Sequence, residues 1–400
     1  SPSPSPPPPP RRAVDAARVH CVAPTNGVLL LSVSDRPNKW LCFLLHSALL
    51  HGLRPVVLGW DPRAWIGGDG VHKRPWTFHL GAKLVLPLEY LRRCTPPNDT
   101  LVVFTDHDVV FQGGYNAIRA AYRRASQHGA RLLFSTEYES YPGDLHAFYP
   151  AKPAGAAFRY LNSGMWAGPA ADVIAMLAVM TGAPTPGLMD YYLNWRPADS
   201  PGAPKPPRAF RENDQVAYAG LFLAQHFARA CRGAPAAGGR GGGGSCYKFV
   251  HDGRERCVAG GRPRCAGEAL WREHPLESSM LGMDYGMQLF ENMYHAGAHQ
   301  LVGGRLRHRS SGAQPIAVHF NGPAKVTFES EWRLPWDARG GRTPVACLLS
   351  AACTSFDQAA QASAERGFGG QVAILDATFQ RLDAGPLNLT CEPCVAFRGC

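Results

Sequence analysis

The sequence predicts an α/β domain built on a mixed, mainly parallel sheet with helices on its faces. The first indication is the unit formed by the strand GVLLLSVSD, the helix KWLCFLLHSALLHG that Gly52 ends, and the strand RPVVLGW. Strand, helix and strand within about 35 residues form a βαβ unit with a parallel pair and a right-handed crossover. The second is an apolar fraction of 45% in 400 residues, which suffices for a sizeable core.

The alternation continues along the chain. It gives the helix HLGAKLVLPLEYLRRC, the strand VVFTDHDVVF, the helix NAIRAAYRRASQHG and the strand ARLLFSTE. Later periodicity is weaker and predicts a short strand and turn in RYLNSGMWAG, the helices PAADVIAMLAVM and ENDQVAYAGLFLAQHFARA, and the strand PIAVHFNG. Ligands of open α/β sheets collect at the carboxyl ends of strands, so we expect the site there.

Composition divides the chain into three parts. Residues 1–24 begin with SPSPSPPPPPRR, which predicts extended polyproline II, either as a stalk or as a disordered tail. Residues 25–334 carry the α/β pattern, with a glycine-rich insertion at about 231–265 whose flanking cysteines favour a disulfide-clamped loop over a zinc site. Residues 335–400 are predicted to form a cysteine-containing C-terminal extension.

Charge and cysteine content indicate the kind of partner and compartment. A net charge of +10 suits an anionic partner such as a nucleotide, whereas arginines spread along the chain and the lack of an RNA-binding or helix-turn-helix pattern disfavour nucleic acid. Twelve cysteines, the sequons Asn98-Asp-Thr100 and Asn388-Leu-Thr390, and the proline-rich start favour the secretory pathway, in the Golgi or ER lumen or outside the cell. We expect an upstream anchor or signal, as in a single-pass type II protein.

Asp106 and Asp108 follow an apolar strand, where ionised carboxylates are costly to bury without a neutralising cation. A D-x-D in this position can hold Mn²⁺ or Mg²⁺, and the ion can bridge the phosphates of a nucleotide. The alternative is a strand-end turn with two solvated aspartates. The preceding strand and the α/β pattern favour the metal.

A second polar group, HFNGPAK, follows the strand PIAV. A lone His at a strand end is usually structural, but His319 beside this loop can supply a third metal ligand and would tip the choice towards manganese. Gly322 lets backbone N–H groups approach a phosphate, and Lys325 adds a point charge beside Asn321.

Two further stretches carry candidate sugar-binding groups. In YLNSG, Asn162 can hydrogen-bond a sugar hydroxyl while Gly164 leaves room for the ring; the alternative is a simple turn. Asp214 stands at a predicted helix start, where it can cap the helix, act as a general base towards an acceptor hydroxyl, or do both.

These pieces, in this order, resemble the glycosyltransferase domain of the procollagen lysyl hydroxylases and of eukaryotic proteins that carry that domain alone. The resemblance spans roughly residues 25–330. It is carried by Gly81-Ala-Lys83, FTDHD, FSTEYESYP with Tyr141 in the place of Trp, YLNSG, Asn213-Asp214-Gln215, Phe290-Glu291-Asn292 and His319–Lys325.

The resemblance implies a GT-A fold, a UDP-sugar donor and Mn²⁺. By position, it assigns Asp106, Asp108 and His319 to the metal. It assigns the nucleotide to Lys83, Asn321, Gly322 and Lys325, and the sugar or acceptor to Asn162, Asp214 and Tyr141. Ser32 and Gly164 are further candidates for binding the UDP-sugar. The expected reaction moves a hexose or pentose to a hydroxyl of a secreted glycoprotein or of its glycan. The resemblance implies hydroxylysine as the linked residue, and the proline-rich start of the chain suggests hydroxyproline.

Three positions depart from the family pattern. The metal motif is D-H-D rather than D-x-x-D, Asn213 replaces the first acid of D-D-Q, and Tyr141 replaces Trp. The altered acidic motifs support an alternative hypothesis, a catalytically degenerate domain that binds sugar or protein. A structural matrix protein with cysteine-rich ends is a more remote alternative.

Overall fold

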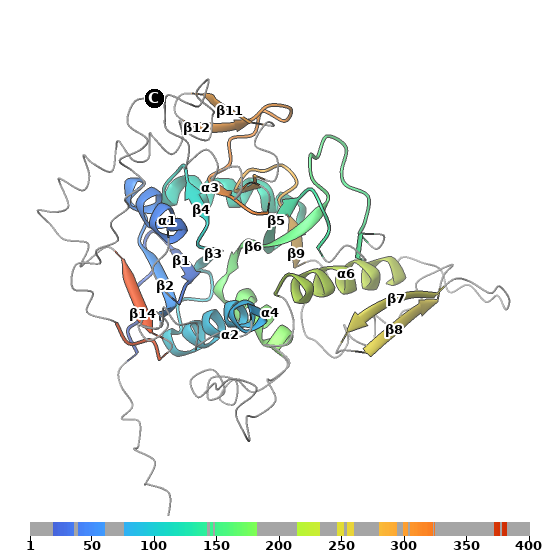
Figure 1. Cartoon of the computed structure of the whole chain (residues 1–400), viewed down its shortest axis with the longest axis horizontal. Helices are drawn as coiled ribbons and strands as arrows, with labels where there is room; N and C mark the ends of the chain where they lie inside the picture. The colour runs from blue at the N-terminus through green and yellow to red at the C-terminus, as the bar shows by residue number, and fades with distance from the viewer. Residues whose placement is uncertain are drawn as a thin grey trace, which may run out of the picture.

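The structure is a computed structural model of the whole chain (Figure 1). It describes residues 19–35, 39–60, 76–141, 145–146, 149–181, 214–232, 246–251, 254–259, 280–293, 299–302, 305–322, 324, 372–376 and 378–381. No helix within these ranges is long and apolar enough to cross a bilayer.

A seven-stranded sheet in the order β14-β2-β1-β3-β6-β5-β9 forms the centre of the molecule. Its strands are β1 (Val28–Val33), β2 (Pro55–Trp60), β3 (Leu101–Thr105), β5 (Leu132–Glu137), β6 (Tyr160–Pro169), β9 (Leu281–Met283) and β14 (Ala373–Asp376). β1 pairs in parallel with both β2 and β3, and β6 runs antiparallel to both β3 and β5. The predicted α/β class with a mixed, mainly parallel sheet is confirmed.

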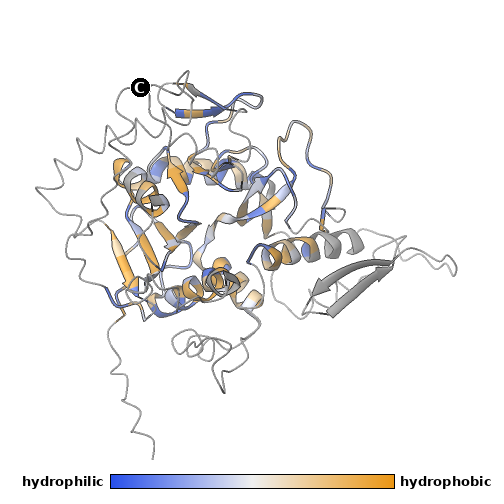
Figure 2. Cartoon of the chain, in the orientation of Figure 1, coloured by the Kyte–Doolittle hydropathy of each residue, from blue (hydrophilic) through white to orange (hydrophobic). Residues whose placement is uncertain are grey.

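Helices cover both faces of this sheet (Figure 1). α2 (Trp76–Cys94), α4 (Ala170–Thr181) and α6 (Asp214–Arg232) share one apolar core with Leu29 and Val102, while α1 (Lys39–Leu50) and α3 (Tyr115–Ala125) share the other with Leu30 and Val103. Successive residues of a strand point to opposite faces, so the near-continuous apolar runs of these strands supply both cores. Figure 2 shows the apolar residues gathered on the strands and on the helices against them.

The run VVFTDHDVVF is divided between two sheets, so the prediction of one strand was wrong. β3 ends at Thr105, and β4 (Val109–Phe111) belongs to a second sheet of order β10-β13-β4, with β10 (Phe290–Asn292) and β13 (Ala317–His319). Both strands are buried, which explains the apolar residues on either side of the two aspartates. The change of sheet places the two aspartates in the turn between them.

YLNSGMWAG is also different from its prediction as a short strand and turn. It lies entirely in the ten-residue strand β6, and its register with β5 shifts between Phe134 and Ser135. Phe134 pairs with Trp166 and Ser135 with Asn162. The two β5 residues are adjacent, but three residues of β6 lie between their partners, so the ladder is irregular at this point.

Segments outside the central pattern are tied to the sheet or form hairpins. A disulfide joins Cys21 to Cys94 at the end of α2, and His20 donates its backbone N–H to the carbonyl of Phe379. β14, from the predicted C-terminal extension, pairs in parallel with β2. The hairpins are β7 (Cys246–His251) with β8 (Arg254–Ala259) and β11 (His299–Val302) with β12 (Arg305–His308), and η2 (Ser126–His128) follows α3.

The predicted domain limits at residues 24 and 334 stay predictions, although residues 19–24 and β14 both contact the sheet or its helices. Residues 1–18 and most of 335–400 lie outside the described residues. The same is true of the predicted cysteine pairing around the 231–265 insertion, of which the backbone of β7 and β8 is described.

Candidate functional site

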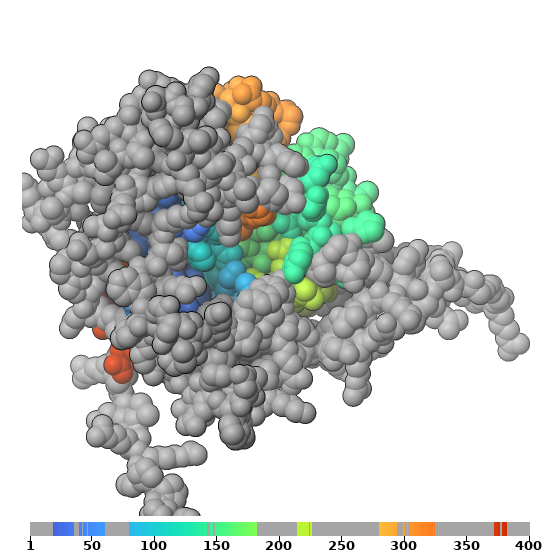
Figure 3. Space-filling model, viewed as in Figure 1, coloured from blue at the N-terminus to red at the C-terminus, as the bar shows by residue number. Residues whose placement is uncertain are grey.

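The turn after β3 and the end of β13 meet at one point. β13 pairs antiparallel with β4, with His319 opposite Val109, and Phe320 donates its backbone N–H to the carbonyl of Asp108 at 3.0 Å. Asp106 is anchored by its own N–H to the carbonyl of Gly164 in β6 at 2.7 Å. Strand pairing therefore brings together residues that are more than 200 positions apart in the chain. Figure 3 shows blue, cyan, green and yellow-green surface, from parts of the chain that are far apart in sequence, meeting in the middle of the view.

Asp106, Asp108 and His319 form a cluster in which one ligand atom of each lies within 4.8 Å of the others. Nε2 of His319 is 3.1 Å from Oδ1 of Asp108 and 3.9 Å from Oδ2 of Asp106. Asp108 and His319 are buried, at 2% and 3% exposure. Two carboxylates and one imidazole are a donor set that suits Mn²⁺, and the one-residue-shorter motif still places both acids against the imidazole.

Asn292 fixes the orientation of the His319 ring. The Asn292 amide donates through Nδ2 to the carbonyl of Thr136 at 2.6 Å, so its Oδ1 must accept from Nδ1 of His319 at 2.7 Å. In neutral His319 the lone pair of Nε2 then faces the carboxylate of Asp108, which is unfavourable without a cation between them. The residues therefore fit a divalent ion, with Asn292 as the partner that sets the ligand's tautomer.

Gly164 leaves the space that the His319 ring occupies. A Cβ at this position would stand 2.2 Å from Cε1 and 2.7 Å from Nδ1 of that ring. The sequence predicted that Gly164 makes room for a sugar, which stays a prediction; in the structure the space beside Gly164 holds the imidazole of His319.

Gly164→Ala is expected to displace the imidazole and to lower Mn²⁺ affinity by about 10–100-fold, the range found when the support of a ligand is lost. Calorimetric titration with Mn²⁺ measures the change. Gly220→Ala is the matched control, because Gly220 lies in α6 with no atom within 4 Å of its added methyl. Equal affinity in both variants would contradict the packing role of Gly164.

Lys83 links the cluster to α6. Its Nζ lies 2.7 and 2.8 Å from the two carboxylate oxygens of Asp106 and 3.7 Å from Oδ2 of Asp214, the first residue of the helix. Burial alone would lower the pKa of Lys83, but the carboxylates of Asp106 and Asp214 outweigh it and raise the pKa, so the ammonium stays charged. Burial raises the pKa of Asp214, which Lys83 opposes. Asp214 thus faces the cluster from its place at the helix start.

Glu137 is the centre of a second, amide-rich group beside the cluster. Its Oε2 accepts from Nδ2 of Asn162 at 2.9 Å and from Nδ2 of Asn321 at 3.1 Å, and its Oε1 accepts from Gln215. Gln215 also accepts through Oε1 from the backbone N–H of Ser163 at 3.3 Å. Sequence reasoning did not select Glu137, although its place at the end of the strand ARLLFSTE was a usable signal.

Burial raises the pKa of Glu137 to about 7, although the amides of Asn162 and Gln215 lower it. We therefore expect the free energy of unfolding of the metal-free protein to fall between about pH 4.5 and pH 7 by up to about 3 kcal/mol. In this window the folded state binds more protons than the unfolded state, whose glutamate is already ionised, so stability decreases as the pH rises.

Urea unfolding in EDTA across this range measures the pH dependence. Glu137→Gln, which resembles the protonated acid, should flatten the curve. A wild-type slope that persists unchanged in Glu137→Gln would show that another group causes it.

The other predicted site residues differ in burial and in their place in the fold. Ser32 is buried in β1 opposite Thr105, the residue before the aspartate turn. Asn321 is 8% exposed and its Oδ1 has no hydrogen-bond partner among the described residues, and Gly322 has φ +52°. Tyr141 is half exposed in the segment after β5. Lys325 lies outside the described residues.

Two comparisons with known proteins bear on this site. Residues 24–185 match the family model described as the PLOD GT domain. A procollagen-lysine,2-oxoglutarate 5-dioxygenase of Drosophila melanogaster is 28% identical over 151 residues, which are 38% of this chain. The match covers 20% of that relative's own length. The part of the chain that matches the family model includes β1 to β6, Asp106 and Asp108.

Proposed function

We propose, from the premise that residues 24–185 form a GT domain of the PLOD family, that the chain is a metal-dependent glycosyltransferase that uses a UDP-sugar. The observation that carries the proposal is the assembly of Asp106, Asp108 and His319 at the carboxyl end of β3. Ligands of such sheets bind at this edge. The GT-A-like sheet and the family match support the same reaction class.

Asp106, Asp108 and His319 are the residues that would hold the divalent ion, Mn²⁺ or Mg²⁺. When bound, the ion supplies positive charge for the diphosphate of the donor and for the UDP that leaves. Asn292 holds the imidazole so that Nε2 points to the two carboxylates. Lys83 contributes a permanent positive charge next to Asp106.

The remaining groups around the cluster would orient the donor and the acceptor. We assign Ser32, Asn321, Gly322 and Lys325 to the nucleotide, and Asn162 and Asp214 to the sugar and the acceptor hydroxyl. Glu137 is a positioning residue in this scheme, because it holds the amides of Asn162 and Asn321. Asp214 would accept the hydroxyl proton if the reaction inverts the anomeric centre; in a retaining reaction the leaving phosphate would accept it.

The acceptor we propose is a hydroxyl on a secretory-pathway glycoprotein, linked through hydroxylysine or hydroxyproline, or on its glycan. Half-exposed Tyr141 offers a stacking face for it four residues beyond Glu137. The disulfide between Cys21 and Cys94 supports a lumenal or extracellular location, since disulfides persist in oxidising compartments.

A UDP-release screen tests the function. UDP-glucose, UDP-galactose, UDP-arabinose and UDP-N-acetylglucosamine are each incubated with the full chain and a hydroxylysine or hydroxyproline peptide, with Mn²⁺ or with EDTA. We expect Mn²⁺-dependent release with one donor. UDP binding that is indifferent to Mn²⁺, without turnover of any donor, would instead support a degenerate sugar- or protein-binding domain.

A further inference from the structure

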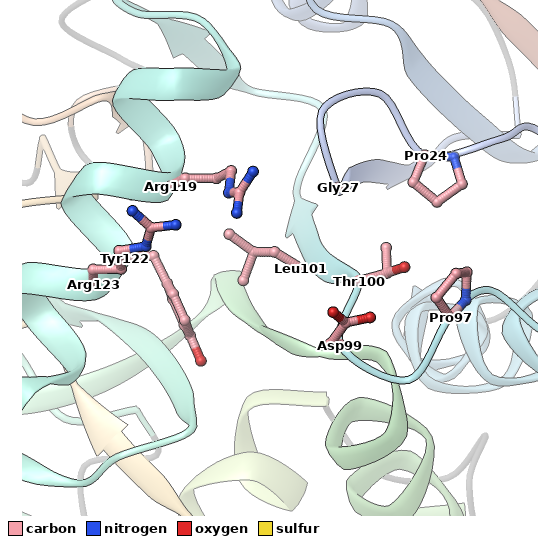
Figure 4. Close-up of a pocket in the computed structure, with 9 residues that line it drawn as sticks. All are labelled: Pro24, Gly27, Pro97, Asp99, Thr100, Leu101, Arg119, Tyr122 and Arg123. Atoms are coloured by element: carbon pink, nitrogen blue, oxygen red, sulfur yellow. The ribbon is translucent and has the colours of Figure 1, made fainter.

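A cavity of about 420 Å³ lies at the end of β3 opposite the metal cluster (Figure 4). Leu101, the first residue of β3, lines the cavity, whereas Asp106 directly follows Thr105, the last residue of that strand. Five strand residues separate the two ends by roughly 16 Å. The cavity is therefore separate from the proposed transferase site.

The rim of the cavity carries the sequon Asn98-Asp99-Thr100. Asn98 and Asp99 are exposed, Thr100 is buried, and the backbone N–H of Thr100 donates to the carbonyl of Pro97 at 2.9 Å in a tight turn. The carbonyl of Asn98 accepts from the N–H of Ala171 at 3.2 Å. The backbone of Asn98 is thus held on the protein while its side chain is in solvent, beside cavity-lining neighbours on both sides.

The far wall of the cavity presents groups that suit a carbohydrate. Figure 4 shows Arg119, Tyr122 and Arg123 extending from α3 on one side, with Asp99 and Thr100 on the other. The Tyr122 hydroxyl donates to the carbonyl of Arg131 at 2.6 Å, and Arg119 donates to the carbonyl of Asn26 at 3.0 Å, so both side chains are fixed. A held aromatic ring flanked by guanidinium groups and a carboxylate offers an apolar face and hydrogen bonds for a sugar.

We propose that Asn98 carries an N-linked glycan whose first sugars pack into this cavity. In the modification, Nδ2 of Asn98 forms a bond to the anomeric carbon of a polyisoprenyl-diphosphate-linked oligosaccharide. The bond from that carbon to the phosphate oxygen breaks, the lipid diphosphate leaves with the electron pair, and the amide loses one proton. The disulfide between Cys21 and Cys94, whose second cysteine lies four residues before Asn98, is consistent with folding in an oxidising compartment, where N-glycosylation takes place.

Glycopeptide mass spectrometry of the full chain secreted from eukaryotic cells tests the attachment. We expect Asn98 to be converted to Asp, with incorporation of ¹⁸O, when peptide N-glycosidase acts in H₂¹⁸O. Asn98→Gln should remove one glycan, while Thr100→Ser, which keeps the sequon, should retain it. An unlabelled Asn98 in well-secreted wild-type protein would overturn the proposal. UDP-sugar turnover is recorded separately, and because Asn98 is remote from the cluster, it should be the same in Asn98→Gln.

Protection of the glycan from enzymatic release tests the packing. We expect native protein to release the Asn98 glycan about tenfold more slowly than denatured protein, equivalent to about 1.4 kcal/mol of sugar contacts. Tyr122→Ala should abolish this difference and Tyr122→Phe, which keeps the ring, should preserve it. Equal release rates in native and denatured wild-type protein would show that the cavity does not hold the sugars.

Discussion

His319→Ala is expected to reduce Mn²⁺-dependent UDP release by at least about 10²–10³-fold. The variant removes one of three ligands, and a bound ion contributes several kcal/mol to charge stabilisation in such reactions, each 1.36 kcal/mol being a factor of ten. Asp108→Ala should have an equal effect, because Oδ1 of Asp108 lies 3.1 Å from Nε2 of His319 in the same buried group. The measurement is initial UDP release at saturating donor across a Mn²⁺ titration.

Two further variants show whether the loss of UDP release comes from the proposed metal ligands. Asn292→Ala keeps all three ligands and removes only the partner of Nδ1, so we expect a smaller loss, about 10–100-fold, that higher Mn²⁺ partly restores. His51→Ala removes an imidazole just after α1 that is outside the cluster, and it should leave turnover unchanged. If His319→Ala and Asp108→Ala both release UDP at the wild-type rate, the metal assignment is wrong.

The parts of the fold with strong local patterns were predictable from the sequence. β1, α1 and β2 follow from apolar runs bounded by Gly52 and its neighbours, and Gly52 adopts the positive φ of +70° that ends a helix. The two aspartates of the cluster were candidates from the sequence, because acids that follow a buried strand are costly to bury without a counter-charge. His319 was also a candidate from its place at a strand end, but its contact with the aspartates depends on the pairing of β13 with β4, which a local pattern does not reveal.

The features that were missed depend on partners far along the chain. VVFTDHDVVF is apolar enough for one strand, but β13 pairs with β4 and draws it into the second sheet. YLNSG has the residues of a turn, yet Tyr160–Asn162 pair with β5 and the residues that follow, Met165–Pro169, pair with β3, so the whole segment is held in the sheet. Tertiary pairing overrides local preference in both cases.

The supporting polar residues had the weakest sequence signal. Asn292 becomes important only because its strand, β10, pairs with β13 and places it opposite His319. Glu137 becomes important only because amides from three separate segments converge on it. Neither role can be inferred from a window of neighbouring residues.

Lys83→Met is expected to destabilise the metal-free protein by about 3–5 kcal/mol, the cost of removing one partner from a buried ion pair. The ammonium now neutralises Asp106 directly and Asp214 at 3.7 Å, and all three side chains are largely buried. Without it, both carboxylates lose their cation in an environment that already raises the pKa of Asp214. Urea unfolding in EDTA at neutral pH measures the loss.

Two controls separate the loss of charge from the loss of packing. Lys152→Met, at an exposed lysine, should change the free energy of unfolding by less than about 0.5 kcal/mol. Lys83→Met combined with Asp214→Asn removes a carboxylate together with the cation that neutralised it. The double variant should therefore recover part of the free energy of unfolding that Lys83→Met loses. The coupling in this double-mutant cycle gives the interaction energy between Lys83 and Asp214. If the double variant loses as much free energy of unfolding as the two single variants together, Lys83 acts by packing.

Added Mn²⁺ makes the same experiment a test of the cluster itself. Because Asp106 belongs both to the ion pair and to the proposed ligand set, a bound ion takes over part of the charge that Lys83 supplies. Binding at 100 times the dissociation constant stabilises a folded protein by about 2.7 kcal/mol, so Mn²⁺ should restore much of what Lys83→Met loses. The rescue should vanish in Lys83→Met combined with His319→Ala. A rescue that persists without the imidazole would mean that the ion binds at a different place, because the cluster as assembled needs all three side chains.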